Sequence, residues 1–170
     1  MNDMLILVDQ HDNPVGEMEK MHAHHKAMLH RAVSVFVFNS KQQLLIHRRA
    51  DNKYHSAGLW TNTACTHPFP NESNEQAALR RLREVMGISI PNMKEIFHFL
   101  YKEDLGYGLT EHEYDHVFVG ITDAVPQPDP NEVSEYKYAS LEEIMEQIKL
   151  KLEDFTIWFK KIIQKISEEN

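Results

Sequence analysis

The chain has 170 residues, 42% of them hydrophobic and 26% charged, which is typical of a globular protein, and we expect residues 1–170 to form a single domain. Its 18 basic and 26 acidic residues give a net charge of −8, which argues against a nucleic-acid partner or an anionic membrane surface. One cysteine excludes an internal disulfide and favours a cytoplasmic location, and the short apolar run near the start fits neither a signal peptide nor a membrane span.

Two strands and a helix are predicted in the first half of the chain. The β-branched and aromatic run AVSVFVFN (32–39) predicts a strand that is buried on both faces. A turn separates it from a second strand at 43–49, and the two are expected to form a hairpin. Residues 73–87 predict a helix, because Ser73 and Gln76 have the spacing of a capping box ahead of an apolar stripe.

Further strands and helices are predicted in the second half of the chain. Segments 95–102 and 113–122 predict strands, and the three prolines within 123–133 predict a loop. A helix is expected over 140–155, followed by a further amphipathic run that reaches Ile166. Strands with interspersed helices indicate the α+β class, with one sheet between layers of helices.

Two short motifs place reactive side chains two residues apart. Cys65 precedes His67, and Glu111 precedes Glu113. In an extended chain each pair projects from one face, so the two carboxylates repel unless a cation lies between them. A run of imidazoles is available upstream, at His22, His24, His25 and His30. Such a His/Glu set suits Mn²⁺, Mg²⁺ or Zn²⁺, although spacing alone leaves open that these side chains are merely solvated.

Basic residues form a second group in this acidic chain. Two Arg-Arg pairs are expected beside loops, and guanidinium groups bind phosphate oxygens in a bidentate manner. The group comprises Lys20, Arg48, Arg49, Lys53, Arg80, Arg81 and Arg83. The pattern favours an anion site, and the alternative is that these residues only solubilise the surface.

Several motifs in one order resemble a known family. LLIHRRADNKYHSAGLWTNTACTHP, ESNEQAALRRLRE, TEHEYDHVF and FTIWF resemble segments of the type I isopentenyl-diphosphate delta-isomerases, which are Nudix proteins. The resemblance covers nearly the whole chain. It implies a Nudix-like α/β/α sandwich in which helices flank a mixed sheet. It also implies interconversion of isopentenyl and dimethylallyl diphosphate by protonation and deprotonation through a carbocation-like intermediate.

The resemblance also implies roles for individual residues. One divalent metal ion (Mn²⁺, Mg²⁺ or Zn²⁺) would be bound by His24, His30, His67, Glu111 and Glu113. His24 follows Lys20 by four residues, as in the family motif, and His25 is the alternative ligand. The catalytic residues would be Cys65, Glu113, Tyr101 and Trp158, with the indole stabilising positive charge on the substrate. Lys20, Arg49, Lys53 and Arg81 would hold the diphosphate together with Mg²⁺. The expected partner is a small isoprenoid diphosphate, and the expected assembly is a monomer or weak homodimer.

The chain departs from the signature of Nudix hydrolases. That signature runs from a glycine through four glutamates to a second glycine, and the matching positions here are Thr66, Glu72, Arg80, Arg81, Glu84, Val85 and Gly87. Arg81 and Val85 replace two of the glutamates, which weakens the hydrolase alternative. Val85 also replaces a glutamate that the isomerase family uses to bind Mg²⁺ at the diphosphate. A third alternative is a catalytically silent module that binds metal or phosphate.

Overall fold

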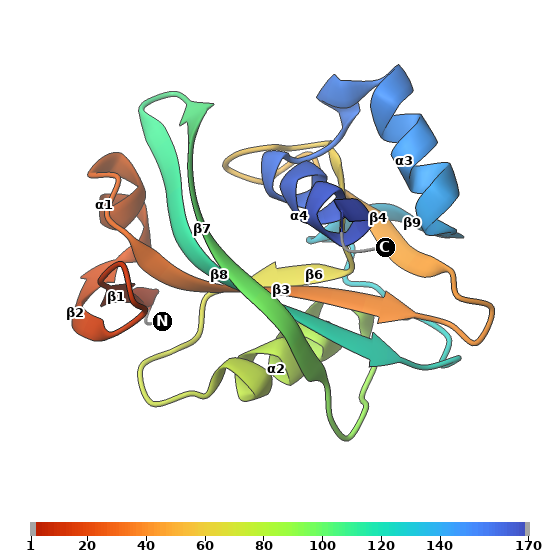
Figure 1. The fold of residues 1–170 in the computed structure, drawn as a ribbon, viewed down its shortest axis with the longest axis horizontal. Helices are drawn as coiled ribbons and strands as arrows, with labels where there is room; N and C mark the ends of the chain where they lie inside the picture. Colours follow the sequence, from red (N-terminus) through yellow and green to blue (C-terminus); the bar gives the residue numbers. More distant parts are fainter. Residues whose placement is uncertain (1–2, 169–170) are drawn as a thin grey trace.

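The computed structural model describes residues 3–168, which form one mixed sheet with helices on both faces (Figure 1). The strands are β1 (Met4–Val8), β2 (Pro14–Glu19), β3 (His30–Phe38), β4 (Leu44–Arg49), β5 (Trp60–Thr61), β6 (Ala64–Thr66), β7 (Lys94–Gly106), β8 (Leu109–Ile121) and β9 (Val133–Ala139). The helices are α1 (Lys20–His25), α2 (Asn74–Met86), α3 (Leu141–Leu150), the 3-10 turn η1 (Leu152–Asp154) and α4 (Ile157–Glu168). No helix within 3–168 is both long enough and apolar enough to cross a membrane.

Strand β3 lies at the centre of the sheet. It pairs in parallel with β8, from His30 opposite Glu113 to Phe38 opposite Ile121, and antiparallel with β6. Strand β8 continues into a long antiparallel hairpin with β7, while β4 pairs with β5 and β9. Because β3 has neighbours on both sides and helices above and below, its side chains are almost all buried, which confirms the strand predicted at 32–39.

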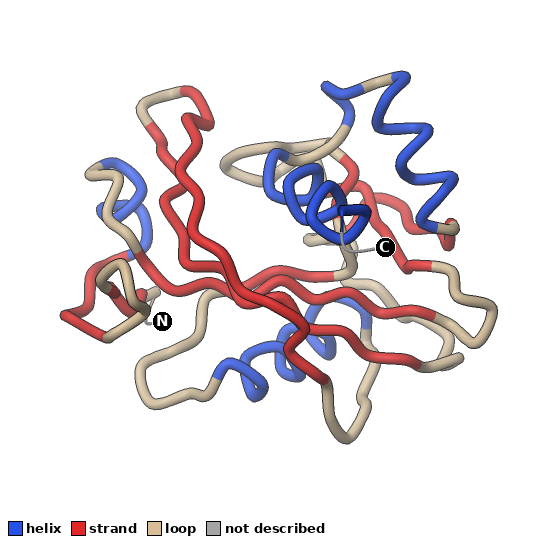
Figure 2. The backbone as a smooth tube through the Cα atoms, viewed as in Figure 1, coloured by secondary structure: helices blue, strands red, loops and turns tan. Residues whose placement is uncertain are grey.

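The two faces of β3 contact different helices, so the molecule has two apolar cores. Val35 and its alternate neighbours pack against α2, whereas Phe36 packs against Phe159 of α4. Figures 1 and 2 show α2 on one face of the sheet and α3 and α4 on the other. Burying each of these phenylalanines contributes about 1.5–3 kcal/mol. The arrangement confirms the predicted α/β/α sandwich.

The helix boundaries follow the capping signals. Helix α2 has both hydrogen bonds of the Ser73–Gln76 capping box and ends at Gly87, whose φ of 64° suits glycine. The helix predicted over 140–155 is wrong at its C-terminal end, because α3 stops at Leu150 and a separate helix begins after Thr156. The Thr156 hydroxyl accepts a hydrogen bond from the Phe159 amide, and the Thr156 amide donates to the carbonyl of Trp60. These contacts start a new helix in a different direction.

The predicted hairpin of 32–39 with 43–49 is correct only at its turn. Strands β3 and β4 pair at Phe38 and Leu44 and then separate. The edges of β3 are occupied by β8 and β6, so β4 pairs with β9 instead. The space that opens where β3 and β4 separate is entered by residues 50–67, which carry several of the predicted site residues.

Candidate active site

A pocket of about 300 Å³ opens where β4, β6, β8 and α2 approach one another. Most of the predicted site residues line it, namely Lys20, Arg49, Lys53, Cys65, His67, Arg81, Glu111, Glu113 and Trp158. His24, His30 and Tyr101 are buried directly behind this wall. The fold thus brings together residues from positions 20 to 158, a proximity that spacing in the sequence did not establish.

Five of these side chains form a compact cluster. His24 Nε2 lies 3.0 Å from Glu111 Oε1, and His30 Nε2 lies 3.5 Å from the same oxygen and 3.4 Å from Glu113 Oε2. His67 Nε2 lies 3.1 Å from Glu113 Oε2. Both glutamates come from one face of β8, as their spacing predicted, and His30 enters from the start of β3.

The buried histidines present the nitrogens that a metal ion needs. His24 Nδ1 donates to the Lys20 carbonyl at 2.7 Å, and His30 Nδ1 donates to the Met28 carbonyl at 2.9 Å. A neutral ring in this tautomer has its lone pair on Nε2, which points into the cluster. Within residues 3–168, neither Nε2 nor Glu111 Oε1 has a hydrogen-bond partner of good geometry. Two imidazole nitrogens and an adjacent carboxylate therefore fit a divalent metal ion.

Helix α1 determines which neighbouring histidine enters the cluster. His24 is fully buried, while the side chain of His25 is exposed. Adjacent helical residues are rotated by about 100° from each other, so only one of the two can face Glu111. The structure places His24, rather than His25, against the carboxylates.

The electrostatics of the cluster lead to a prediction about metal binding. Burial opposes the charged form of His30, but the carboxylates of Glu111 and Glu113, 3.5 and 3.4 Å from Nε2, outweigh burial and raise its pKa to about 10. At neutral pH this ring is protonated without metal, and binding requires its neutral form. We expect Mn²⁺ binding to release at least one proton per ion and the affinity to rise with pH. Titration of metal-free protein in weak buffer with a pH indicator measures the release, and the absence of any released proton would contradict this prediction.

Cys65 and Glu113 occupy distinct parts of the pocket wall. Burial raises the pKa of Cys65 to about 12, so its side chain is a thiol at neutral pH, and Asn62 Nδ2 donates to its sulfur at 3.3 Å. Tyr101 donates its hydroxyl hydrogen to Glu113 Oε1 at 2.7 Å, and burial raises the pKa of Tyr101 well above its usual value. The pocket lining therefore combines a protonated sulfur with a carboxyl group that accepts a hydrogen bond from Tyr101.

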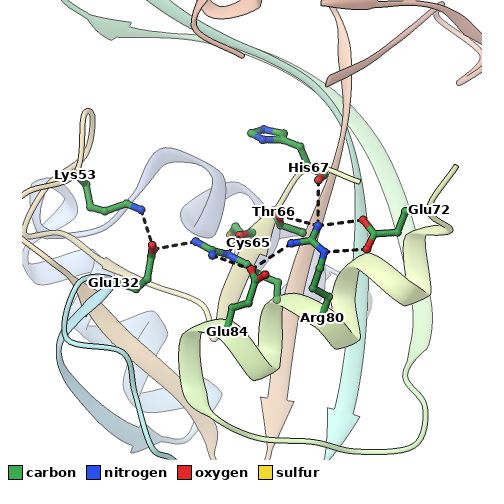
Figure 3. Close-up of polar contacts among 9 residues, drawn as sticks. Lys53, Cys65, Thr66, His67, Glu72, Arg80, Glu84 and Glu132 are labelled. Atoms are coloured by element: carbon green, nitrogen blue, oxygen red, sulfur yellow. Dashed lines mark hydrogen bonds and ion pairs between the residues drawn. The ribbon is translucent and has the colours of Figure 1, made fainter. Parts of the chain in front are cut away.

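Basic side chains lie at the mouth of the pocket (Figure 3). Lys53 Nζ is 2.7 Å from Glu132 Oε1, and Arg81 Nη2 is 2.8 Å from the same oxygen. Arg81 Nε also donates to the carbonyl of Cys65 at 2.9 Å. Arg81 Nη1 also lies 3.2 Å from Glu84 Oε1, so these two cations are paired with Glu132 and Glu84, and the oxygens of a polyanion can take over part of this pairing.

Two further cations contact aromatic rings. The Arg49 guanidinium is buried, 5.3 Å from the Trp158 ring, and donates to the carbonyl of His55. Lys20 Nζ lies 4.6 Å from the ring of Tyr54. Trp158 is itself buried and lines the pocket, as an aromatic wall requires.

The other arginine of the pair in α2, Arg80, has a structural role. Arg80 is bound to Glu72 at 2.8 Å and contacts the carbonyl of His67 (Figure 3). Its guanidinium also stacks on the ring of Phe69, 3.9 Å from the centroid. These contacts brace the loop between His67 and α2. Both arginines line the pocket, and Arg80 is the one whose guanidinium is bound to Glu72 and the loop after His67.

Several pocket residues were not identified from the sequence. Glu132 lies in a proline-containing segment predicted only as loop, and Tyr54 and His55 lie in the segment between the Arg-Arg pair and the cysteine. Burial lowers the pKa of His55 to about 3, so its ring is neutral beside the cluster. Asp115 is buried beneath the pocket and accepts a hydrogen bond from Ser34 at 2.7 Å. Asp115 follows Glu113 by two residues, as Glu113 follows Glu111, so all three acidic side chains lie on one face of β8. This spacing is the sequence signal that could have identified Asp115 as a site residue.

The valine at position 85, where the isomerase family has a glutamate, is buried in the structure. Val85 packs into the core between α2 and the sheet, whereas Glu84 lines the pocket and lies 3.2 Å from both Arg80 Nη1 and Arg81 Nη1. The carboxylates at the pocket mouth therefore include Glu84 and Glu132, and Asp3 also lines the pocket.

Comparisons with known proteins agree with this arrangement. The NUDIX domain family matches residues 28–164. The chain is 49% identical to an isopentenyl-diphosphate Delta-isomerase of Pectobacterium atrosepticum, over 96% of this chain and 91% of that protein. It is 48% identical to isopentenyl-diphosphate Delta-isomerase 2 of Photorhabdus laumondii, over 100% and 96% of the two chains.

Solved structures share the fold at lower sequence identity. A Deinococcus radiodurans protein superposes with a TM-score of 0.79 at 22% identity, covering 95% of this chain and 98% of that chain. A MutT protein from Methanosarcina mazei gives 0.66 at 24% identity, over 84% and 95%. Together, the family match and the near full-length relatives show that the chain belongs to the NUDIX domain family and, within it, to the isopentenyl-diphosphate Delta-isomerases.

Proposed function

We propose that the protein interconverts isopentenyl diphosphate and dimethylallyl diphosphate. The observation that carries this proposal is the combination, in one pocket, of a protonated Cys65 and the carboxylate of Glu113 with a ring of cations at the mouth. The relatives that match nearly the whole chain are named isopentenyl-diphosphate Delta-isomerases, which supports the proposal.

The reaction requires two proton transfers at a carbon skeleton. A proton is added to C4 of isopentenyl diphosphate and another is removed from C2. The double bond therefore shifts from the C3–C4 position to the C2–C3 position. An alkene is a very weak base, and its protonation needs a positioned acid and a site that excludes water. We assign these transfers to Cys65 and Glu113, with Tyr101 holding Glu113 in place. The face of Trp158 would stabilise the positive charge that develops at C3.

The histidine and glutamate cluster would hold one divalent metal ion. His24, His30, His67, Glu111 and Glu113 supply the ligands in this proposal, and the bound ion would compensate the charge of the two neighbouring carboxylates. His24 and His30 are fixed by their backbone hydrogen bonds, so they would hold the ion beside Glu111 and Glu113.

The diphosphate would bind at the mouth of the pocket with Lys20, Arg49, Lys53 and Arg81. Lys53 and Arg81 now share Glu132, and the phosphate oxygens would take over part of this pairing. Mg²⁺ would accompany the diphosphate. Because Val85 is buried in the core, the ligands of such an ion would come from other carboxylates of the pocket lining, among them Asp3, Glu84 and Glu132.

The proposed phosphate contact of Arg81 can be tested by mutation. Arg81→Met keeps the length of the side chain and removes its charge, which should lower kcat/KM by about 10- to 100-fold, mainly through KM. Steady-state kinetics with isopentenyl diphosphate measure this. Arg83→Met is the matched control, since Arg83 is exposed in the same helix and outside the pocket lining. An unchanged KM in Arg81→Met would remove Arg81 from the diphosphate site.

The activity itself can be tested by the acid lability of the product. Allylic diphosphates ionise in dilute acid much faster than isopentenyl diphosphate, so radiolabelled substrate becomes acid-labile as it isomerises. We expect acid-labile label to accumulate with metal-loaded protein. A Nudix-type hydrolase would instead release phosphate from an unshifted carbon chain, and a silent binding module would leave the substrate intact.

A further inference from the structure

A second group of histidines and carboxylates lies on the opposite face of β8. Glu111 and Glu113 point into the pocket, so the alternation of the strand turns His116 to the other side. His116 is paired across the strands with His98 of β7, and a β-bulge between Glu95 and Phe97 brings Glu95, three residues before His98, to the same group. None of these three residues lines the pocket.

The three side chains converge on one point. His116 Nδ1 lies 3.0 Å from Glu95 Oε2, and His98 Nδ1 lies 3.1 Å from the same oxygen. One ligand atom from each residue lies within 4.8 Å of the other two. His116 is buried and Glu95 partly so, whereas His98 is half exposed, so the group is open to solvent on one side.

The ring of His116 lies between two carboxylates. Its Nε2 is 2.8 Å from Asp12 Oδ2, and its Nδ1 faces Glu95. A neutral imidazole has a single N–H, so it can donate to only one of these oxygens. The hydrogen bond to Asp12, which Arg31 holds at 2.9 Å, leaves the lone pair of Nδ1 pointing at an oxygen. Either a second proton on the ring or a metal ion bound at Nδ1 makes this contact with Glu95 favourable.

We propose that Glu95, His98 and His116 bind a divalent transition-metal ion of the Zn²⁺ class, with water as the fourth ligand. Two imidazole nitrogens and one carboxylate oxygen form a donor set typical of zinc. Ligands about 2.0–2.1 Å from a tetrahedral ion are about 3.4 Å apart, so the contacts in this cluster need to lengthen by only a few tenths of an ångström. Asp12 would then be the carboxylate that orients a metal-bound histidine.

The position of this site gives it a structural consequence. Asp12 lies in the turn that joins β1 and β2, and β1 contributes Met4 and Leu5 to the pocket wall. An ion bound through His116 would strengthen the link from β8 to that turn. The N-terminal hairpin would be anchored on the outer face of the sheet while its other end borders the pocket.

Zinc stoichiometry tests the proposal. Metal-free protein is dialysed against buffered Zn²⁺, and the bound metal is measured by mass spectrometry. We expect two ions per wild-type chain, one in the pocket cluster and one here, and a single tight ion in His98→Ala. His98 is half exposed, so this variant should fold. His22→Ala removes another exposed histidine and should keep both ions. One ion in the wild type, or an unchanged second ion in His98→Ala, would overturn the proposal.

A second variant tests the orienting carboxylate. Asp12→Asn keeps the shape of the side chain and tolerates the left-handed backbone at this residue, where φ is 64°. We expect it to weaken the second Zn²⁺ by about 10- to 100-fold, with the pocket ion unaffected. If only a proton occupies the cluster, Zn²⁺ affinity will be the same in wild type and Asp12→Asn, which would contradict the proposal.

Discussion

Replacing Cys65 with alanine should lower kcat by at least about a thousandfold without unfolding the protein. The reason is chemical, because alanine has no proton to exchange with the substrate and no other thiol exists in the chain. The sulfur accepts a hydrogen bond from Asn62, and its loss leaves the Arg81 contact with the Cys65 carbonyl in place. Turnover by the acid-lability assay and the melting temperature measure the two halves of the prediction.

Thr66→Ala is the matched control for this variant. Thr66 follows Cys65 in β6, and among residues 3–168 its hydroxyl is hydrogen-bonded only to Arg80, at 3.5 Å. It should retain wild-type kcat and show the same circular dichroism spectrum as Cys65→Ala. Normal turnover in Cys65→Ala would exclude the thiol from the proton transfers.

The Glu113→Gln substitution should have an effect of similar size. The amide keeps the shape and can still accept the Tyr101 hydrogen bond, but it is neither a base nor a negatively charged metal ligand. We expect kcat to fall by about 100- to 10,000-fold and the affinity of the pocket metal to fall as well. Kinetics at saturating Mn²⁺ separate the two effects, because loss of metal alone would be restored by added ion.

Glu103→Gln provides the comparison for Glu113→Gln. Glu103 lies on β7 opposite Glu111, outside the pocket lining, and forms an ion pair with Lys161 at 2.8 Å on the surface. Such a pair contributes little, so this variant should retain full activity. If Glu113→Gln with metal bound turned over as fast as Glu103→Gln, Glu113 would have no role in proton transfer.

Local patterns predicted the elements well where one physical signal dominated. The apolar run of β3 and the capping box of α2 identified a buried strand and a helix with its N-terminus. Strand β9 was missed, because most of its residues are polar and exposed at an edge, so they lack the alternation of a half-buried strand. The break between α3 and α4 depends on the contact of Thr156 with Trp60, about a hundred residues away in sequence.

The site was only partly predictable for the same reason. Spacing indicated that Glu111 and Glu113 share a face, and this is local information. Their meeting with His30 depends on the parallel pairing of β3 with β8, and local spacing does not determine that pairing. The resemblance supplied the choice of His24 and the roles of Cys65 and Trp158, which remain predictions. Glu132 had neither a motif nor a periodic pattern to indicate it.

The most direct test of the central claim is proton NMR of isopentenyl diphosphate incubated with the protein and Mg²⁺ in deuterated water, with ³¹P spectra of the same sample. The proposed mechanism predicts dimethylallyl diphosphate that carries deuterium in a methyl group, because the proton added at C4 comes from a group that exchanges with solvent. The diphosphate signals should persist. Release of inorganic phosphate without a double-bond shift, or an unchanged spectrum with metal supplied, would contradict it.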